Sequence, residues 1–395
     1  MFSRRTNWKL VQNAYSQALA EARAQGRRLL DLTVSNPTRC GFQFDIKAVL
    51  ATLAMPESLD YDPQPQGLLK AREAVAHYYD DVAVGNRTRV SPEQIFLTTG
   101  TSEAYSFLFR LLCDPGDEVL VPRPSYPLFE FLADIQDVQL RFYELFYDHG
   151  WHIDIAGLRA AVSERTRAVL VVNPNNPTGS FVHAPEMNQL GSICREKKLA
   201  LIADEVFLDY AVEAHAEVSA AFSTECLSFA LSGLSKISCL PQMKLAWLVI
   251  NGPEQLCAQA RERLEVIADT YLSVNAPIQH AAAKLLSLRG EIQTQLLQRV
   301  RENLAILDAA LRSTPSTQRL RVEGGWYAVL RVPATSSDEE LAVDLIRRKR
   351  ILVHPGHFYD FPRMGFLVVS LITPKEEFGR GAEALLKHAS KMAMP

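Results

Sequence analysis

The sequence contains no long apolar run, no closely paired cysteines and no large excess of charge of either sign. Its longest apolar stretches, such as residues 366–373, have the length of a β-strand, well short of the roughly 18 residues of a transmembrane helix. Lys and Arg number 42 against 45 Asp and Glu, and the net charge is -3. Such a balance provides no basic surface for nucleic acid or an anionic membrane, so we expect neither partner.

The cysteine pattern and the first residues indicate the cellular compartment of the protein. Six cysteines lie far apart, without a Cys-x-x-Cys pair or a histidine at metal-ligand spacing, so we expect reduced thiols in an intracellular protein and no metal. The first 28 residues carry six Lys or Arg and one acid, Glu21, but lack the apolar core of a secretory signal. We interpret them as a basic amphipathic helix rather than an organellar transit peptide, and predict a cytoplasmic location.

The middle of the chain predicts a sheet that is buried on both faces. From about residue 90 to 250, short and continuously apolar runs alternate with helical patterns, including helices over 102–112 and 187–197. Continuous apolarity is typical of parallel strands covered by helices on both sides. The runs are QIFLTT, EVLVP, LRFYEL, RAVLVVN, LALIAD, LSFALS and LAWLVI.

After about residue 253 the pattern changes. Long helical stretches are expected over 253–269, 276–288 and 291–312, followed by the strand-like runs WYAVLRVP, ILVHPG and FLVVSLIT and by helices over 337–349 and 375–392. We therefore predict an α/β fold with a mostly parallel central sheet, helices on both faces, and a smaller α+β domain. The large domain is expected over residues 46–285, and the small domain over 1–45 together with 286–395.

The first candidate site is the segment from Thr98 to Ala104, which follows the run QIFL and opens a helical pattern. Gly100 would allow close approach of a ligand, and the free amides at a helix N-terminus favour an anion such as phosphate. The hydroxyls of Thr101 and Ser102 would add hydrogen bonds. The same residues also serve as ordinary helix caps, so this segment alone leaves both interpretations open.

The second candidate site is the string NPNNPTG at residues 173–179, directly after the run AVLVV. Its prolines and glycine indicate a rigid loop at the carboxyl end of a strand, where open α/β sheets bind their ligands. A simple turn would need only one Asn and one Gly. We therefore interpret the longer string as part of a site.

Two charged residues end further apolar runs. Asp204 closes LALIAD, and a carboxylate buried there requires a cationic or hydrogen-bonding partner, with a structural salt bridge as the alternative. Lys236 closes the segment SGLSK after the run FAL. Such a lysine either extends to water or is a functional amine with a lowered pKa.

In this order and spacing, the four segments resemble the fold-type-I aminotransferases that use pyridoxal 5′-phosphate, specifically the class I/II, aspartate-aminotransferase-like family. The strings Asn-Asn-Pro-Thr-Gly and Ser-x-x-Ser-Lys are highly specific, and the phosphate segment is moderately so. Tyr61 with Pro63 and Gly67, and the segment from Pro122 to Pro127, match as well. The resemblance extends from Asp31 to the last apolar run.

The resemblance implies a role for each of these residues. Lys236 would form the Schiff base with the cofactor and then move a proton between substrate and cofactor. Asp204 would pair with the pyridine nitrogen, Asn176 would donate to the phenolate oxygen, and Tyr126 would stack on the ring. Lys236, Asp204 and Tyr126 are thus the expected catalytic residues. The phosphate would be held by Gly100, Thr101, Ser102 and Ser235, and by Tyr61 of a neighbouring subunit, which implies a homodimer with shared active sites.

Two cofactor-binding positions depart from the family pattern. Eight residues after Lys236, Lys244 replaces the arginine that binds the phosphate, so the charge is kept while the bidentate fork is lost. Three residues after Asp204, Phe207 replaces a tyrosine that donates to the phenolate oxygen. We expect both residues at the cofactor, with no donor at Phe207.

The third departure concerns the substrate. The last strand of the family carries an arginine two residues before a serine, and this arginine binds the α-carboxylate. Alignment on Ser370 places Val368 at that position. Arg39 and Arg363 are candidate replacements, and ordinary surface arginines are the alternative for both. The candidate substrate-binding residues are Ser35, Arg39, Asn176 and Arg363.

The resulting hypothesis is an aminotransferase that moves an amino group between an amino acid and a 2-oxo acid through a Schiff base on Lys236. Alternatives within the fold are a lyase that performs C–S β-elimination, a decarboxylase, and a transaminase of amines rather than α-amino acids. A non-catalytic regulator fits less well, because the roughly 30 residues before Asp31 are too few for a DNA-binding domain.

Overall fold

The computed structural model describes residues 1–8, 11–82, 89–213 and 219–392, and its largest element is an eight-stranded sheet. Its spatial order is β2 (Ile95–Thr98), β9 (Ala246–Asn251), β8 (Ser228–Gly233), β7 (Ala200–Asp204), β6 (Thr166–Val172), β3 (Glu118–Arg123), β4 (Gln139–Tyr147) and β5 (Trp151–Ile153). The five strands β8, β7, β6, β3 and β4 are parallel to one another, whereas β5 and β9 run antiparallel to the strands beside them. The predicted mostly parallel sheet is therefore confirmed.

Helices cover both faces of this sheet because alternate strand residues point to opposite sides. In β6, Val169 and Val171 contact one buried cluster, whereas Ala168 and Leu170 contact the other. The first cluster includes residues of the helices α3 (Leu69–Val82), α7 (Ala184–Lys197) and α10 (Ala276–Ser287). The second includes residues of α4 (Thr101–Leu112), α5 (Phe129–Ile135) and α9 (Glu254–Tyr271).

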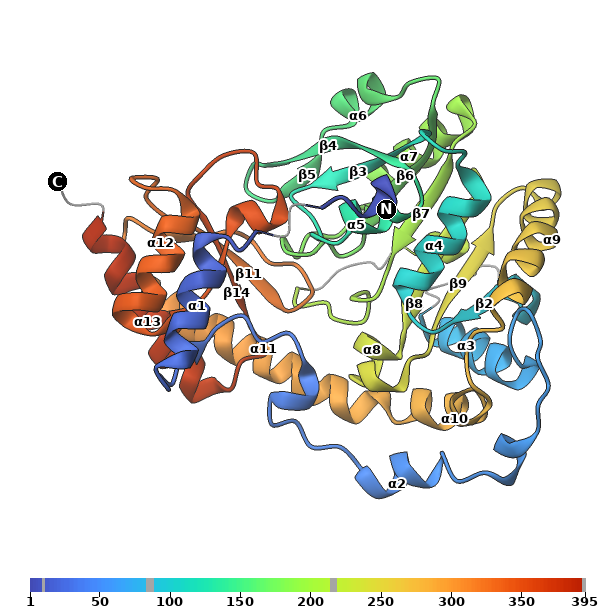
Figure 1. Cartoon of the computed structure of the whole chain (residues 1–395), viewed down its shortest axis with the longest axis horizontal. Helices are drawn as coiled ribbons and strands as arrows, with labels where there is room; N and C mark the ends of the chain where they lie inside the picture. Colours follow the sequence, from blue (N-terminus) through green and yellow to red (C-terminus); the bar gives the residue numbers. More distant parts are fainter. Residues whose placement is uncertain (9–10, 83–88, 214–218, 393–395) are drawn as a thin grey trace.

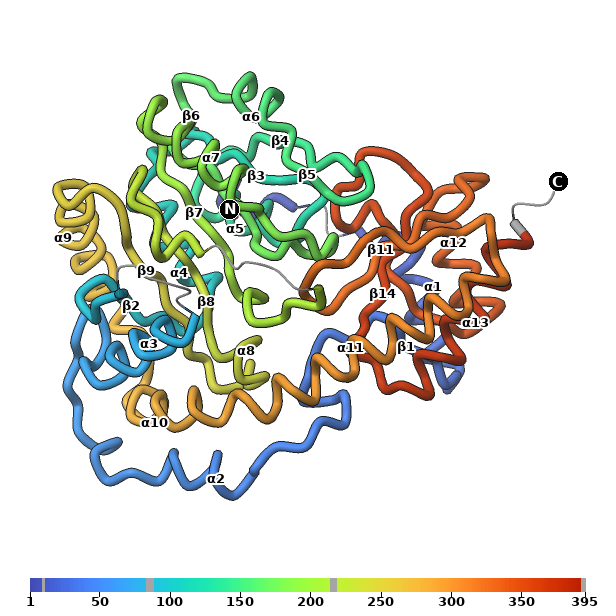
Figure 2. Tube along the Cα trace, turned by 180° about the vertical axis from the view of Figure 1, so that it is seen from behind, coloured from blue at the N-terminus to red at the C-terminus, as the bar shows by residue number. Residues whose placement is uncertain are grey.

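A second, antiparallel sheet lies at the other side of the molecule (Figure 1). Its order is β10 (Gln318–Arg319), β11 (Tyr327–Arg331), β14 (Phe366–Ser370) and β13 (His354–Pro355). The helices α1 (Ala14–Ala24), α12 (Asp338–Asp344) and α13 (Lys375–Met392) surround it, and α11 (Arg289–Leu311) runs from α10 to this sheet, as Figure 2 shows. The short helices α2 (Ile46–Ala51), α6 (Ile155–Ala161) and α8 (Leu234–Ile237) complete the list of α-helices in the described residues.

The expected elements differ from the structure at several points, including the following three. The run ILVHPG forms two strands rather than one, since β12 (Ile351–Leu352) pairs with β1 (Leu30–Asp31) while β13 pairs with β14. The helix expected over 337–349 continues beyond α12 as a π-helical turn, Leu345–Lys349. Strand β5 was not expected, because a three-residue edge strand carries too short a pattern to detect. The domain boundaries stay a prediction.

Four parallel strands carry the candidate motifs to one edge of the large sheet. Thr98 ends β2, Asp204 ends β7, and residues 173–179 and 234–237 follow β6 and β8. Because the carboxyl ends of parallel strands meet at the same edge, segments far apart in sequence converge there. In the part of the chain that the structure describes, no helix is long and apolar enough to cross a membrane.

Candidate active site

A cavity of about 190 Å³ opens at this edge of the sheet and collects most of the residues that the sequence singled out. Two further lining residues, Tyr327 and Val206, had no signal in the sequence. Six predicted residues do not line the cavity: Gly100, Ser102, Lys244, Arg39, Arg363 and Tyr61. The predicted residues that do are Ser35, Thr101, Tyr126, Asn176, Asp204, Phe207, Ser235 and Lys236.

Lys236 lies in α8, the single helical turn that follows β8. The chain passes close to β9 at Gly233, where an added Cβ would lie 2.7 Å from the Cβ of Ala246, so only glycine fits without a shift. The ammonium group lies 4.7 Å from the ring centre of Trp326 and 5.4 Å from that of Phe207. Burial lowers the pKa of Lys236 to about 8, against the opposing effect of Asp204. With this pKa, roughly a tenth of the Lys236 side chains carry the neutral, nucleophilic amine at pH 7, a far larger fraction than for an exposed lysine.

Asp204 is a buried carboxylate that lacks a cationic partner. Its Oδ2 accepts a hydrogen bond of 2.7 Å from the Tyr105 hydroxyl, and its Oδ1 accepts one of 3.2 Å from the amide of Val206. Burial raises the pKa of Asp204, and these hydrogen bonds and Lys236 oppose the shift only in part. No ion pair with a described residue neutralises it. The site therefore favours a cationic ligand group beside Asp204.

The NPNNPTG loop is held by its own side chains. Asn175 donates through Nδ2 to the Pro124 carbonyl and to Thr178 Oγ1, and its Oδ1 accepts from Ser125. Asn176 lies next to it with a different environment, because its Oδ1 is buried and has no hydrogen-bond partner among the described residues. This amide lines the cavity and is available to a ligand.

Helix α4 begins at Thr101 and directs its N-terminus at the same region. The first amides of a helix have no partner within the helix, so those of Thr101 and Ser102 can bind an anion. A Cβ on Gly100 would lie 3.4 Å from the Lys244 ammonium, which places that positive charge beside the helix N-terminus. Lys244 thus occupies the neighbourhood expected for the phosphate-binding cation.

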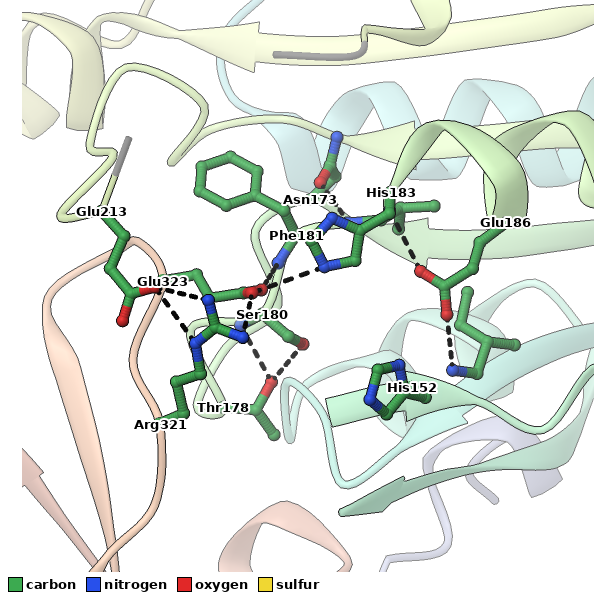
Figure 3. Close-up of polar contacts among 12 residues, drawn as sticks. His152, Asn173, Thr178, Ser180, Phe181, His183, Glu186, Glu213, Arg321 and Glu323 are labelled. Atoms are coloured by element: carbon green, nitrogen blue, oxygen red, sulfur yellow. Dashed lines mark hydrogen bonds and ion pairs between the residues drawn. The ribbon is translucent and has the colours of Figure 1, made fainter. Parts of the chain in front are cut away.

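A second polar cluster, shown in Figure 3, joins the NPNNPTG loop to the segment before β11. The Gly179 carbonyl accepts from the amides of Glu323 and Gly324, at 3.1 and 2.8 Å. The Glu323 carboxylate accepts a hydrogen bond of 3.1 Å from the amide of Phe181, and it lies 3.4 Å from the ring nitrogen of His183 and 3.5 Å from the Arg321 guanidinium. This connection fixes Trp326 and Tyr327 relative to Asn176. No local sequence pattern indicates this connection, because its two halves are far apart in the chain.

The residues expected to bind substrate are only partly brought together. Ser35 and Asn176 line the cavity, whereas Arg39 and Arg363 are exposed and lie outside its lining. Val368 is fully buried in β14. Tyr61 is 82% exposed in the single chain, and it lines a different groove beside the segment 272–280.

These features fit pyridoxal 5′-phosphate. The buried carboxylate of Asp204, which has no counter-ion among the described residues, suits a protonated pyridine nitrogen. The buried Oδ1 of Asn176 has no hydrogen-bond partner in the described chain, which indicates room for a polar group of a ligand. The N-terminus of α4 beside Lys244 suits a phosphate. The amine of Lys236 faces the same cavity. Within the described ranges, no group of three or more His, Cys, Asp or Glu is arranged to hold a metal ion.

Comparison with known proteins agrees with this geometry. Residues 7–385 match the family described as aminotransferase class I and II. The alanine aminotransferase of Mycobacterium tuberculosis is 30% identical over 360 residues, which cover 89% of this chain and 83% of that protein. The glutamate-pyruvate aminotransferase AlaA of Escherichia coli is 26% identical over 347 residues, covering 86% and 84%.

Solved structures show the same fold. An alanine aminotransferase from Pyrococcus furiosus superposes with a TM-score of 0.88 at 23% identity, covering 99% of this chain and 100% of that one. A Thermus thermophilus aspartate aminotransferase mutant gives 0.83 at 21% identity, covering 98% and 99%. The chain therefore belongs to the class I and II aminotransferases, enzymes that depend on pyridoxal 5′-phosphate.

Proposed function

We propose that this aminotransferase moves the amino group of a small amino acid, alanine or glutamate foremost, to a 2-oxo acid. The observation that carries this proposal is the meeting of Lys236, Asp204 and Asn176 in one cavity, with the lysine pKa lowered to about 8. The relatives named as alanine and glutamate-pyruvate aminotransferases support the choice of donor.

Each residue of the cavity has a task that follows from its surroundings. When bound, the cofactor supplies an aldehyde that takes up an amino group and a ring that accepts electrons. Lys236 would hold the cofactor through its amine and, when released, would carry the proton to and from the substrate α-carbon. Asp204, held by Tyr105, would supply a negative charge to the ring nitrogen and so favour its protonated form.

The surrounding side chains orient the reactants and exclude water. Phe207 and Trp326 meet edge to face with ring centres 5.0 Å apart beside Lys236, which keeps its amine in an apolar environment. Tyr126 stands beside the cavity at the segment after β3, where it would stack on the ring. The N-terminus of α4, Ser235 and Lys244 would hold the phosphate.

The active unit that we propose is a homodimer. Tyr61 is 82% exposed and Leu59 is 91% exposed in the single chain, although both are large apolar side chains. A partner subunit that covers this segment would bury them and bring Tyr61 to the phosphate of the other cavity. A cytoplasmic location is proposed on the scattered cysteines of the sequence.

The purified holoenzyme tests the proposed function directly. Incubation with L-alanine should give pyruvate and the amine form of the cofactor, without release of ammonia or carbon dioxide. Addition of 2-oxoglutarate should then restore the starting absorbance and yield glutamate. Release of pyruvate, ammonia and a thiol from a cysteine S-conjugate would indicate a lyase, and release of carbon dioxide from an amino acid a decarboxylase.

A further inference from the structure

The amine of Lys236 faces aromatic rings rather than an acid. Its Nζ lies over the ring of Trp326, 4.7 Å from the ring centre, and over that of Phe207, at 5.4 Å. In the part of the chain that the structure describes, Lys236 forms no ion pair with an acidic side chain. The face of an aromatic ring carries partial negative charge, so it attracts a cation at such distances, and tryptophan does so most strongly.

Trp326 is packed firmly in this position. Its side chain is fully buried, and its carbonyl accepts a hydrogen bond of 2.8 Å from the amide of Leu371. Its ring meets that of Phe207 edge to face, with ring centres 5.0 Å apart, and lies 5.5 Å from the ring of Tyr210. Because buried side chains interlock with their neighbours, the indole cannot turn away from Lys236 without displacing these rings.

Tyr210 ties the backbone of Lys236 to the segment that carries Trp326. Its hydroxyl donates a hydrogen bond of 2.6 Å to the Lys236 carbonyl. Its own carbonyl accepts one of 2.9 Å from the amide of Gly325, the residue before Trp326. The contact between the amine and the indole is therefore set by the backbone on both sides, and not by the conformation of the lysine side chain alone.

The proposed reaction requires Lys236 to carry a positive charge while it is buried. Once the amino group of the substrate has taken its place on the cofactor, the free amine removes a proton from the substrate α-carbon. The C–H bond breaks, a new N–H bond forms, and the electron pair of the C–H bond stays with the substrate and the cofactor ring. The amine thereby becomes an ammonium in a site where burial disfavours charge. A ring face that attracts this ammonium therefore favours the transfer.

We propose that Trp326, with Phe207 beside it, holds the free ammonium of Lys236 and makes this lysine a stronger base than its buried position alone would allow. The inference rests on the proposed aminotransferase function. Trp326 is a positioning residue, because it acts through Lys236 and does not line the cavity. Phe207 lines the cavity and contributes the second, more distant ring.

Two roles of Trp326 predict opposite shifts of the Lys236 pKa. If the ring attracts the cation, its removal in Trp326→Leu should lower the pKa of Lys236 by about one unit, the size of a partly desolvated cation–π contact. If the ring only excludes water, its removal should hydrate the amine and raise the pKa from about 8 toward the ordinary 10.5. The direction of the shift therefore separates the proposed role from a merely structural one.

The pKa is measured on the full chain without cofactor, so that the measurement does not depend on turnover. Trace labelling with acetic anhydride followed by peptide mapping reports the neutral amine of each lysine, and it is carried out between about pH 6 and pH 10. The pH midpoint of Lys236 labelling should lie about one unit lower in Trp326→Leu than in the wild type. The midpoint of Lys197, at the exposed end of α7, should not move.

Three further variants sharpen the test. Trp326→Phe keeps a smaller ring face, so its midpoint should lie between those of the wild type and Trp326→Leu. Phe207→Leu removes the second ring with little change of volume, and it should lower the midpoint by about half a unit. Trp151→Leu is the matched control, because Trp151 is a buried tryptophan of β5 outside the cavity lining, and it should leave the midpoint of Lys236 unchanged.

The holoenzyme gives a second readout. In Trp326→Leu, kcat for alanine should fall by up to about ten-fold, because a base weakened by one pKa unit accepts the proton less readily. The rate difference between alanine and α-deuterated alanine should increase, since proton transfer becomes the slower step. Trp151→Leu should leave both quantities as in the wild type.

A Lys236 midpoint that stays in place or rises in Trp326→Leu would show that the proposal is wrong. Thermal unfolding verifies that each variant is folded, and where Trp326→Leu is not, the same two outcomes in Phe207→Leu decide. A lowered midpoint in a chain that converts no amino acid would support the hold on the ammonium and refute the proposed function. Transamination by a chain whose midpoint does not move would do the reverse.

Discussion

The two walls of the active site differ in charge. The edge of the large sheet contributes Lys236 and Asp204 to the cavity, with Lys244 nearby. The small sheet contributes the uncharged Tyr327 to the lining, and outside the lining it carries Val368 and the pair of His354 and Tyr359. The cofactor presents the same groups in every reaction, so fixed charges on its side are useful throughout the cycle. Among the described residues, the small sheet adds no charged side chain to the cavity lining. The comparison teaches that the charges of this site are concentrated on the side of the large sheet.

The largest expected effect is at the charged wall, with Lys236→Ala. Removal of the amine should lower the rate of transamination by more than about 10⁴-fold, the upper end of what a positioned acid–base group contributes. Borohydride reduction followed by peptide mapping should place the cofactor on Lys236 in the wild type. Lys197→Ala, which changes a lysine at the exposed end of α7, serves as the control. Labelling of another lysine would contradict the assignment.

Asp204→Asn removes the fixed negative charge while the shape of the side chain is kept. We expect kcat to fall by about 10²- to 10³-fold with a much smaller loss of cofactor affinity, since the phosphate contacts remain. Asp209→Asn is the control, because Asp209 is a half-buried acid that accepts a hydrogen bond of 2.7 Å from the Tyr78 hydroxyl but does not line the cavity. A near wild-type rate in Asp204→Asn would limit this residue to a structural role.

The sequence predicted the charged wall far better than the neutral one. Continuously apolar strands and the motifs at their carboxyl ends are visible in the local pattern, and the structure brings Asp204, Asn176 and Lys236 together in one cavity. Tyr105 and Glu323 carry no local signal, because their partners Asp204 and Gly179 come from other parts of the chain.

The neutral wall depends on how one short run is divided between two sheets. ILVHPG predicts a single strand, but residues 351–352 pair with β1 and residues 354–355 pair with β14. Only this division brings His354 next to Val368 and within hydrogen-bond distance of Tyr359. Pairing between distant strands is set by tertiary packing, which a local pattern does not encode.

The lowered pKa of His354 should make the folded protein less stable at low pH. In the folded protein the pKa of His354 is about 4, whereas an exposed histidine titrates near 6.5, so the unfolded chain binds more protons between these values. Stability should therefore be complete above about pH 6.5 and fall as the pH decreases, by about 2 kcal/mol at pH 5 from this residue. Urea unfolding of wild type and His354→Phe at pH 7 and pH 5 measures this difference. Equal losses in both proteins would show that His354 does not contribute.

Glu323→Gln tests whether the connection between the two walls matters. The amide can still accept from Phe181, but the charge facing His183 and Arg321 is lost, so we expect a destabilisation of about 1 to 2 kcal/mol. The KM for substrate should rise as Tyr327 and Asn176 lose their fixed relation. Glu213→Gln removes an exposed partner of the same arginine and should change stability by less than about 0.5 kcal/mol. Equal effects of the two substitutions would argue against a buried connection.

The smallest expected effect is Phe207→Tyr, which adds a polar group to the apolar side of the charged wall. Phe207 is buried against Trp326 and lies 5.4 Å from the Lys236 ammonium. A phenol here can donate to the phenolate oxygen of the bound cofactor and thereby stabilise its deprotonated form. Because one hydrogen bond contributes about 1 kcal/mol, the absorbance transition of the holoenzyme should move to lower pH by about one unit or less.

A spectral titration of the holoenzyme measures this shift. Phe142→Tyr is the control, because it adds the same hydroxyl to a 40% exposed side chain of β4 outside the cavity, and its transition should match the wild type. A transition that stays in place or moves to higher pH in Phe207→Tyr would contradict the assignment of Phe207 to the cofactor oxygen. A shift to lower pH would show that the missing donor of this chain lies at residue 207, and that the charged wall can be tuned without changing the neutral one.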